Sequence, residues 1–199
     1  MTLLEIPAER SRERCSPVLE TERLILRAPT LEDAKSIAKL ANDRRIAENT
    51  ARIPHPYGIA DARQYISWAN ETRSEIAFLV TLDDDTIIGA CGVGQVEGEN
   101  PEIGYWIGTR YWGKGFATEA ARAVIDYAFD RFEYDALHSS ARVTNPASRR
   151  VLEKCGFQWT GAGLGRSRAL GSSVPVDRFR LDCGLWASLK SWGKAKRVV

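Results

Sequence analysis

The sequence is poor in the residues that build metal centres and disulfide frameworks. Its 199 residues include four cysteines, at positions 15, 91, 155 and 183, and two histidines. The cysteines lie far apart and form no Cys-x-x-Cys pair, so their spacing predicts neither a zinc site nor a set of disulfides. We therefore expect reduced thiols, no bound metal and a cytoplasmic protein.

Net charge and long apolar runs are missing too. The chain has 28 Lys and Arg against 26 Asp and Glu, a formal charge of +2. Such a chain lacks the broad positive surface of a dedicated nucleic-acid binder. Its first 17 residues are rich in charge, and no later stretch has the length and apolarity of a membrane span. We expect no secretory signal and no membrane contact, and any anion must be held locally.

The hydrophobic residues that are present, 44% of the chain, suffice for one folded domain. We expect a leader at 1–18, a single domain at 19–186 and a basic tail at 187–199. Apolar periodicity predicts an α/β fold, one mixed sheet with helices on both faces. The expected strands are 22–27, 76–82, 86–96, 101–109, 137–143, 157–160 and 176–185, the expected helices are 31–42, one beginning near 60, 116–132 and 146–156, and a loop is expected at 161–171.

The sharpest local feature is a strand that runs through a glycine turn into a helix, at residues 104–120. Gly113 and Gly115 permit backbone torsions that other residues avoid, so successive N–H groups can converge on an anion. The positive end of the following helix favours a phosphate at the same point. A Walker loop is excluded, because no Gly-Lys pair is followed by Ser or Thr. A Rossmann fingerprint is excluded too, because the third glycine is missing and no βαβ unit carries an acidic residue at the expected distance. An ordinary glycine turn stays open as the alternative.

Two motifs resemble those of a known family. Arg110-x-x-Gly113-x-Gly115 resembles the phosphate-loop motif of the GNAT superfamily of N-acetyltransferases, and residues 145–157 resemble its second motif. Together with segments near residues 30, 88 and 102, the pattern is similar to the RimJ/RimL branch, whose founding members acetylate the N-terminal amines of ribosomal proteins. The resemblance covers residues 22–185. It implies a GNAT fold, acetyl-CoA as the cosubstrate and no metal.

The resemblance also implies where acetyl-CoA binds. Its pyrophosphate would lie on the backbone amides of residues 110–118, and its pantetheine arm between strands 102–109 and 137–143, which splay apart. Asn145 and Ser148 would contact the pantetheine near the sulfur. For Asn145 helix capping is a second role, and for Arg149 a solvated helix face is the alternative to a phosphate contact. The expected cofactor-binding residues are Ile107, Gly108, Arg110, Trp112, Gly113, Lys114, Gly115, Phe116, Ala117, Thr118, Asn145, Ser148 and Arg149.

In this family the amine attacks acetyl-CoA directly, and the four cysteines offer no acyl-enzyme nucleophile. Glu102 is the candidate general base, acting through a water, with a surface carboxylate as the alternative. A backbone N–H near Ile107 or Gly108 would meet the oxyanion. Many members place a tyrosine four residues after the position of Ser148 to protonate the thiolate, but Leu152 stands there. Ser148 or a water is therefore expected to assist the leaving group, unless the thiolate leaves unassisted.

The acceptor side is less defined. By resemblance, the loops at 53–58 and 161–175 line the amine site, with His55, Tyr57 and Asp177 as candidate substrate-binding residues. A packing role for His55 and a solvated carboxylate for Asp177 are the alternatives. The leading interpretation is acetylation of a protein N-terminal amine. Acetylation of a polyamine, amino sugar or antibiotic, a non-catalytic acetyl-CoA sensor, contact of the tail with ribosomes or nucleic acid, and a homodimer all stay open.

Overall fold

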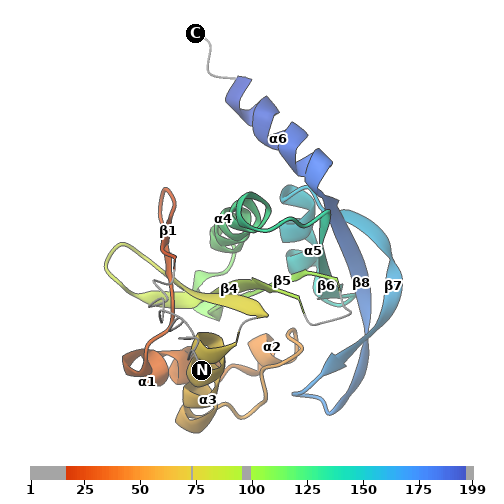
Figure 1. The fold of residues 1–199 in the computed structure, drawn as a ribbon. Coiled ribbons are helices and arrows are strands. Elements are labelled where there is room, and N and C mark those ends of the chain that lie inside the picture. The colour runs from red at the N-terminus through yellow and green to blue at the C-terminus, as the bar shows by residue number, and fades with distance from the viewer. Residues whose placement is uncertain (1–16, 73, 96–99, 196–199) are drawn as a thin grey trace, which may run out of the picture.

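The computed structural model describes residues 17–72, 74–95 and 100–195. Within them the chain forms one eight-stranded sheet with helices on both faces (Figure 1). The strands are β1 (Leu19–Glu20), β2 (Ile25–Arg27), β3 (Glu75–Thr81), β4 (Ile87–Gly94), β5 (Glu102–Ile107), β6 (Ala136–Arg142), β7 (Gln158–Ser167) and β8 (Ser172–Asp182). The helices are α1 (Ala34–Ala41), α2 (Arg44–Ala47), α3 (Ile59–Glu71), α4 (Phe116–Arg131), α5 (Pro146–Lys154) and α6 (Cys183–Ala195), with 3₁₀ turns η1 (Leu31–Asp33) and η2 (Thr109–Tyr111).

The sheet is mixed because one pair of neighbours runs parallel. Its order is β1-β2-β3-β4-β5-β6-β8-β7, and each neighbouring pair of described strands is antiparallel except β5 and β6. Helix α4 makes the crossover between β5 and β6, as a parallel pair requires. The expected fold class is confirmed.

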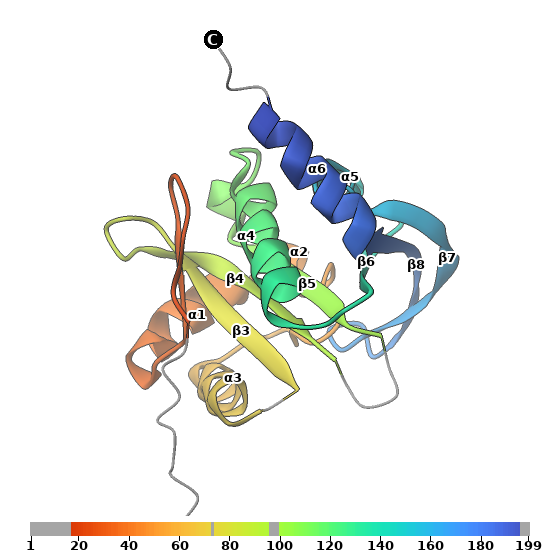
Figure 2. The ribbon, with the colours of Figure 1, turned by 45° about the horizontal axis from the view of Figure 1, so that its top comes forward.

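Alternate strand residues supply two hydrophobic clusters, one on each face of the sheet. On β3, Phe78 and Val80 belong to the cluster that includes α4, whereas Leu79 belongs to the cluster that includes α1 and α3. Figure 2 shows α4 lying across the sheet, with α1 and α3 against its other face. Ala120 and Ala128 of α4 are fully buried, so the helix backbone approaches the sheet closely.

The prediction of a loop at 161–171 is wrong. Strand β7 continues to Ser167, and a tight turn leads into β8, with Ser167 paired to Ser172. Gly163 and Gly165 lie in this edge strand, where an added Cβ would come within 2.8 and 2.9 Å of β8 side chains. Glycine here allows close approach within a hairpin. The same residues read as a loop in the sequence.

The segment expected as a tail at 187–199 begins inside a helix. Helix α6 starts before the expected boundary and leads away from the body of the domain (Figure 1). The Trp186 ring centroid lies 5.0 Å from that of Phe129 on α4. Trp186 Nε1 also donates to Asp126 Oδ1 at 2.6 Å. These contacts dock the start of α6 on the C-terminal half of α4.

The two ends of the chain reach beyond the described part. Residues 1–16 of the expected leader and 196–199 of the expected tail lie outside the described residues. Of the tail cations, Lys190 pairs with Asp130 on α4 at 3.1 Å and so contributes to helix docking. Among the described residues, no helix is long and apolar enough to cross a membrane.

A partly buried ion pair holds the start of α1 against the sheet. Arg27 on β2 donates to the two Asp33 oxygens at 2.9 and 3.0 Å, and the Thr30 N–H donates to Asp33 at 2.7 Å. Burial alone would raise the pKa of Asp33, but the hydrogen bonds from Arg27 and Thr30 outweigh it and lower that pKa. The carboxylate therefore closes a capping box and an ion pair at once.

Asp33→Asn should lower the free energy of unfolding by about 3 kcal/mol, because the Arg27 guanidinium loses its buried carboxylate partner and keeps only the exposed Asp85. The folded-state pKa of Asp33 lies below the unfolded value, so its contribution is complete above about pH 4 and is lost as the pH falls further. Urea unfolding at neutral and acidic pH measures both effects. The matched control Asp130→Asn breaks an exposed pair and should cost less than about 1 kcal/mol. Equal losses in the two variants would contradict the prediction.

Candidate active site

The site forms where β5 and β6 separate. The parallel pair is in register at Glu102 and His138, where the His138 N–H donates to the Pro101 carbonyl at 2.8 Å. Next, the Ser139 hydroxyl, rather than a backbone group, donates to the Ile103 carbonyl at 3.0 Å. Beyond this point no described residue of β5 is in register with β6. The strands therefore diverge, as expected for a pantetheine slot.

The alternating direction of backbone N–H and C=O groups along β5 decides which of them face the resulting gap. The Gly108 N–H donates to the Ile88 carbonyl at 2.8 Å, and neighbouring residues of a strand direct their backbone groups to opposite sides. Ile107 therefore faces the gap, and its carbonyl accepts Trp112 Nε1 at 2.6 Å. Two backbone N–H groups were expected near the oxyanion. The Gly108 N–H is already bonded to the Ile88 carbonyl, so the Ile107 N–H is the candidate donor to the oxyanion.

The glycine turn has the left-handed torsions that favour glycine. The φ angle is +76° at Gly113 and +85° at Gly115. A Cβ on Gly113 would meet no heavy atom within 4 Å, so the turn borders open space next to the N-terminus of α4. Glu119 in the first turn of α4 accepts from Arg23 Nε at 2.7 Å, and Arg23 Nη1 donates to the Lys114 carbonyl at 3.1 Å. Arg23 thus fixes both sides of the turn.

A cavity of about 360 Å³, the donor cavity, extends from this turn to the N-terminus of α5. Asn145 caps α5, since its Oδ1 accepts the Ser148 N–H at 3.1 Å, which confirms the expected capping role. Nine of the expected cofactor residues line the cavity: Ile107, Trp112, Gly113, Gly115, Phe116, Ala117, Thr118, Asn145 and Ser148. The two motifs therefore meet around one space.

Arg149 is among the expected residues that lie elsewhere. Its Nε donates to Glu153 at 2.9 Å and its Nη1 lies 3.4 Å from Asp177 Oδ2, outside the donor cavity. Arg150 and Lys154, four residues apart on one helical face, line the cavity instead. The expected residues that do not line it are Gly108, Arg110, Lys114 and Arg149.

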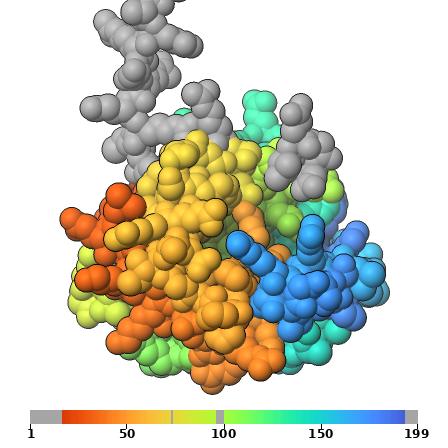
Figure 3. Space-filling model, turned by 90° about the horizontal axis from the view of Figure 1, so that it is seen from below, coloured from red at the N-terminus to blue at the C-terminus, as the bar shows by residue number. Residues whose placement is uncertain are grey.

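A second cavity of about 510 Å³, the acceptor cavity, lies on the sheet face that carries α1 and α3. Figure 3 shows the hollow between the orange and yellow segments and the blue β7–β8 hairpin. The Arg168 N–H at the hairpin turn donates to the Ala51 carbonyl in the α2–α3 connection at 2.9 Å. This hydrogen bond joins the two walls.

Of the expected substrate-binding residues, Tyr57 lines the acceptor cavity, whereas His55 and Asp177 do not. Tyr57 is buried, and this burial together with the charge of Asp61 raises the pKa of its phenol to about 12. His55 is exposed to solvent. Asp177 accepts from Trp159 Nε1 at 2.9 Å and also faces Arg149, so its carboxylate is already engaged.

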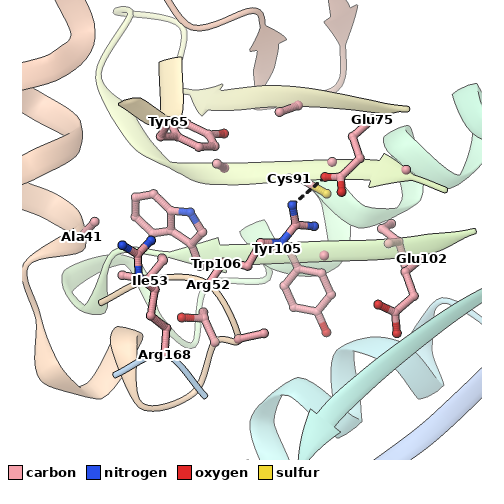
Figure 4. Close-up of a pocket in the computed structure, with 18 of the residues that line it drawn as sticks. Ala41, Arg52, Ile53, Tyr65, Glu75, Cys91, Glu102, Tyr105, Trp106 and Arg168 are labelled. Carbon is pink, nitrogen blue, oxygen red and sulfur yellow. Dashed lines mark hydrogen bonds and ion pairs between the residues drawn. The ribbon is translucent and has the colours of Figure 1, made fainter. Parts of the chain in front are cut away.

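Carboxylates from several elements converge on the acceptor cavity. Glu102, the expected base, is exposed at the start of β5, and Asp61 and Glu75 also line the space. Figure 4 shows Glu75 beside Arg52, whose Nη1 donates to Glu75 Oε2 at 2.8 Å. Three carboxylates therefore line this one cavity.

The two cavities share five lining residues: Asn49, Thr50, Tyr105, Trp106 and Ser148. We call these residues the junction. The Tyr105 hydroxyl lies 2.9 Å from Ser148 Oγ and donates to the Ser148 carbonyl at 3.1 Å. Burial raises the pKa of Tyr105, and the hydrogen bond with Ser148 only partly offsets it, so the phenol stays protonated.

Sequence reasoning missed Tyr105, Asn49 and Thr50. Tyr105 lies in the segment near residue 102 that resembles the family, but its partner Ser148 is 43 residues away. Asp43 holds Asn49 and Thr50 near β5, because it caps α2 and accepts from Thr109 Oγ1 at 3.0 Å. Hydrogen bonds from Arg45 and Thr109 lower the pKa of Asp43 to about 2, so it is ionised at neutral pH.

Comparisons with known proteins agree with this geometry. The model of the acetyltransferase (GNAT) domain family matches residues 23–158. The chain is 31% identical over 169 residues to the uncharacterized N-acetyltransferase p20 of Bacillus licheniformis, covering 82% of this chain and 94% of the relative. It is 30% identical over 145 residues to the putative ribosomal N-acetyltransferase YdaF of Bacillus subtilis, covering 68% and 78%.

A solved structure shares the fold. Spermidine N-acetyltransferase from Vibrio cholerae, in complex with CoA and spermine, has a TM-score of 0.72 at 22% identity and covers 84% of this chain and 99% of its own. With the family match over most of the chain, the conclusion is direct: the chain belongs to the GNAT acetyltransferase family. It is an acetyl-CoA-dependent N-acetyltransferase, as expected from its motifs.

Gly113→Ala should weaken CoA binding at least about tenfold, because an added Cβ enters the space from which backbone N–H groups reach a phosphate. Gly171→Ala is the matched control, since Gly171 also has a positive φ of +61° and an open surrounding but lies in the β7–β8 turn. Both variants should lose about 1 kcal/mol of stability through backbone strain. Calorimetric titration with CoA measures the difference. Equal affinities in the two variants would rule out a phosphate site at Gly113.

Proposed function

We propose that the protein transfers the acetyl group of acetyl-CoA directly to a primary amine while both substrates are bound. The observation that carries this proposal is the junction, where the donor and acceptor cavities share their lining. Ligands in the two cavities would meet there in reacting geometry. Burial raises the pKa of Cys91, the cysteine that lines the acceptor cavity, and disfavours it as an acyl-carrying nucleophile.

The donor cavity fits acetyl-CoA by its own features. It has open space at Gly113, the positive end of α4, the cations of Arg150 and Lys154, and the Ile107 backbone facing the gap. When bound, acetyl-CoA supplies a thioester whose carbonyl carbon takes the amine nitrogen and whose sulfur leaves with the C–S electron pair. The Ile107 N–H is the proposed donor to the carbonyl oxygen as charge develops there.

Glu102 is the proposed general base. Its carboxylate lines the acceptor cavity and is exposed, so a water can carry the amine proton to it. The proton that is lost from the nitrogen therefore ends on a carboxylate in contact with bulk solvent. No second enzyme group is needed for this step.

The acceptor that we propose is the N-terminal amine of a protein, with a ribosomal protein as the candidate suggested by the similarity to YdaF. An α-amino group has a pKa of about 8, against about 10.4 for lysine, so more of it is neutral near physiological pH. The hollow between the α2–α3 connection and the β7–β8 hairpin would admit a chain end whose remainder stays outside (Figure 3). A small cationic amine is the second candidate, because Asp61, Glu75 and Glu102 line the cavity.

Labelled acetyl-CoA should transfer its label to peptides with free N-termini, and to ribosomes if ribosomal proteins are the acceptors. Polyamines and aminoglycosides form the second arm of the assay. Glu102→Gln should lower kcat about a hundredfold with unchanged CoA affinity, because it removes the base without altering the donor cavity. The exposed Glu133→Gln is its control. If the protein binds CoA but no amine becomes labelled, the protein is a non-catalytic acetyl-CoA sensor and not an enzyme.

Ser148 is the proposed donor to the departing sulfur, and Tyr105 positions it. Leu152, where many family members have a tyrosine, is fully buried and offers no polar group. Because the single Tyr105 hydrogen is donated to the Ser148 carbonyl, the Ser148 hydroxyl donates to the Tyr105 oxygen in the free protein, and it would turn from this oxygen to the sulfur as thiolate charge develops. The phenol and the serine then act as one donor unit that stabilises the thiolate.

Tyr105→Phe should raise the pKa of the thiol of bound CoA by about 1, because the serine hydroxyl loses its orientation. Ultraviolet absorbance of the thiolate during a pH titration of the CoA complex measures this directly. Cys91 and Cys155, the titratable groups that act on Tyr105, stay protonated over that range because burial raises the pKa of both.

Ser148→Ala should have the same effect, and the double variant should add little. Tyr127→Phe, a change in the α4 core outside both cavities, is the matched control. Affinity for desulfo-CoA should stay constant throughout. An unmoved thiol pKa in Tyr105→Phe would refute the positioning role while leaving acetyl transfer intact.

We also propose that the protein works in the cytoplasm. Cys91, Cys155 and Cys183 are free thiols, and the first two are buried. Free thiols suit a reducing compartment, and acetyl-CoA is available there.

A further inference from the structure

Only one of the two arginines that line the acceptor cavity takes part in an ion pair among the described residues. Arg52 and Arg168 line it, together with the carboxylates Asp61, Glu75 and Glu102. Arg52 is engaged with Glu75, which is largely shielded from solvent. No ion pair joins Arg168 to any residue in the described part of the chain.

Arg168 is held at a defined place. Its N–H donates to Ala51, the residue after Thr50 of the junction, and its charge acts on the buried Tyr57 phenol. In Figure 4, Arg168 lies toward one end of the cavity and Glu102 toward the other. The backbone of the hairpin turn is therefore fixed beside the α2–α3 connection, and the exposed Arg168 side chain lines the cavity from there.

A guanidinium in this position is suited to an anion. It offers several donors in one plane and matches a carboxylate or a phosphate in two parallel hydrogen bonds. Arg52 does not compete for such an anion, because its guanidinium lies against Glu75 and over the Trp68 ring at 5.2 Å. A polyamine, which is cationic along its length, has no acceptor group to offer Arg168 and would be repelled by this guanidinium.

We propose that the acceptor is an amine that also carries an anionic group, and that Arg168 binds this group. The inference rests on the proposed function and narrows its substrate class. Because Arg168 and the junction line the same cavity, one acceptor would carry both its amine and its anionic group inside that cavity. The carboxylate of an amino acid, an acidic side chain in the first residues of a peptide and the phosphate of a small amine all meet this requirement.

Matched acceptor pairs test the proposal and separate these sources. The pairs are Ser-Glu and Ser-Gln peptides with blocked C-termini, an amino acid and its amide, and phosphoethanolamine and ethanolamine. In at least one pair the anionic member should have a KM about tenfold lower, the size expected for hydrogen bonds to a charged group. The pair that responds identifies the source of the anion.

Arg168→Gln should raise KM about tenfold for that anionic acceptor and leave its neutral partner and kcat unchanged. Arg166→Gln is the matched control, because Arg166 is exposed on β7 and lines neither cavity. Equal KM values within all pairs, or an equal effect of Arg168→Gln on both members, would overturn the proposal. Transfer to polyamines alone would overturn it too. No transfer to any amine would instead refute the proposed function.

Discussion

The separation of β5 from β6 is the constraint on which the site depends. After the registered pair Glu102 and His138, one side of β5 faces a gap, and both cavities border this strand. Alternation along β5 then assigns neighbouring side chains to different clusters, with Tyr105 on the α4 side and Trp106 on the side of α1 and α3. One strand therefore serves as the common wall of a donor compartment and an acceptor compartment.

Ionic contacts hold other segments against this wall. Glu119 and Arg23 fix the glycine turn to the chain before β2, and Asp43 ties α2 to η2 through Thr109. All these bonds join segments far apart in sequence, and none replaces a backbone hydrogen bond of the sheet. Side-chain contacts thus hold the segments around the junction, and they leave the backbone groups of β5 that face the gap available to ligands.

Features set by local chemistry could be predicted from the sequence, and features set by packing could not. The torsions of Gly113 and Gly115 and the cap at Asn145 depend on residues next to them, and all were expected. Arg149 and Arg150 differ only in helical phase, which the sequence alone left undecided. Tyr105 acquires its role from a distant serine, and the glycines of β7 acquire theirs from side chains of β8. The class of enzyme could therefore be predicted from the sequence, but the residues that line the acceptor cavity could not.

The hydrogen bond between Arg168 and Ala51 has a consequence for how this family diversifies. It joins two connections, 51–58 and the β7–β8 turn, and neither contributes a residue to the donor cavity. Insertions or exchanges in these connections would reshape the acceptor cavity and leave the lining of the donor cavity unchanged. The donor cavity can thus stay constant while the acceptor cavity, which would select the amine, changes.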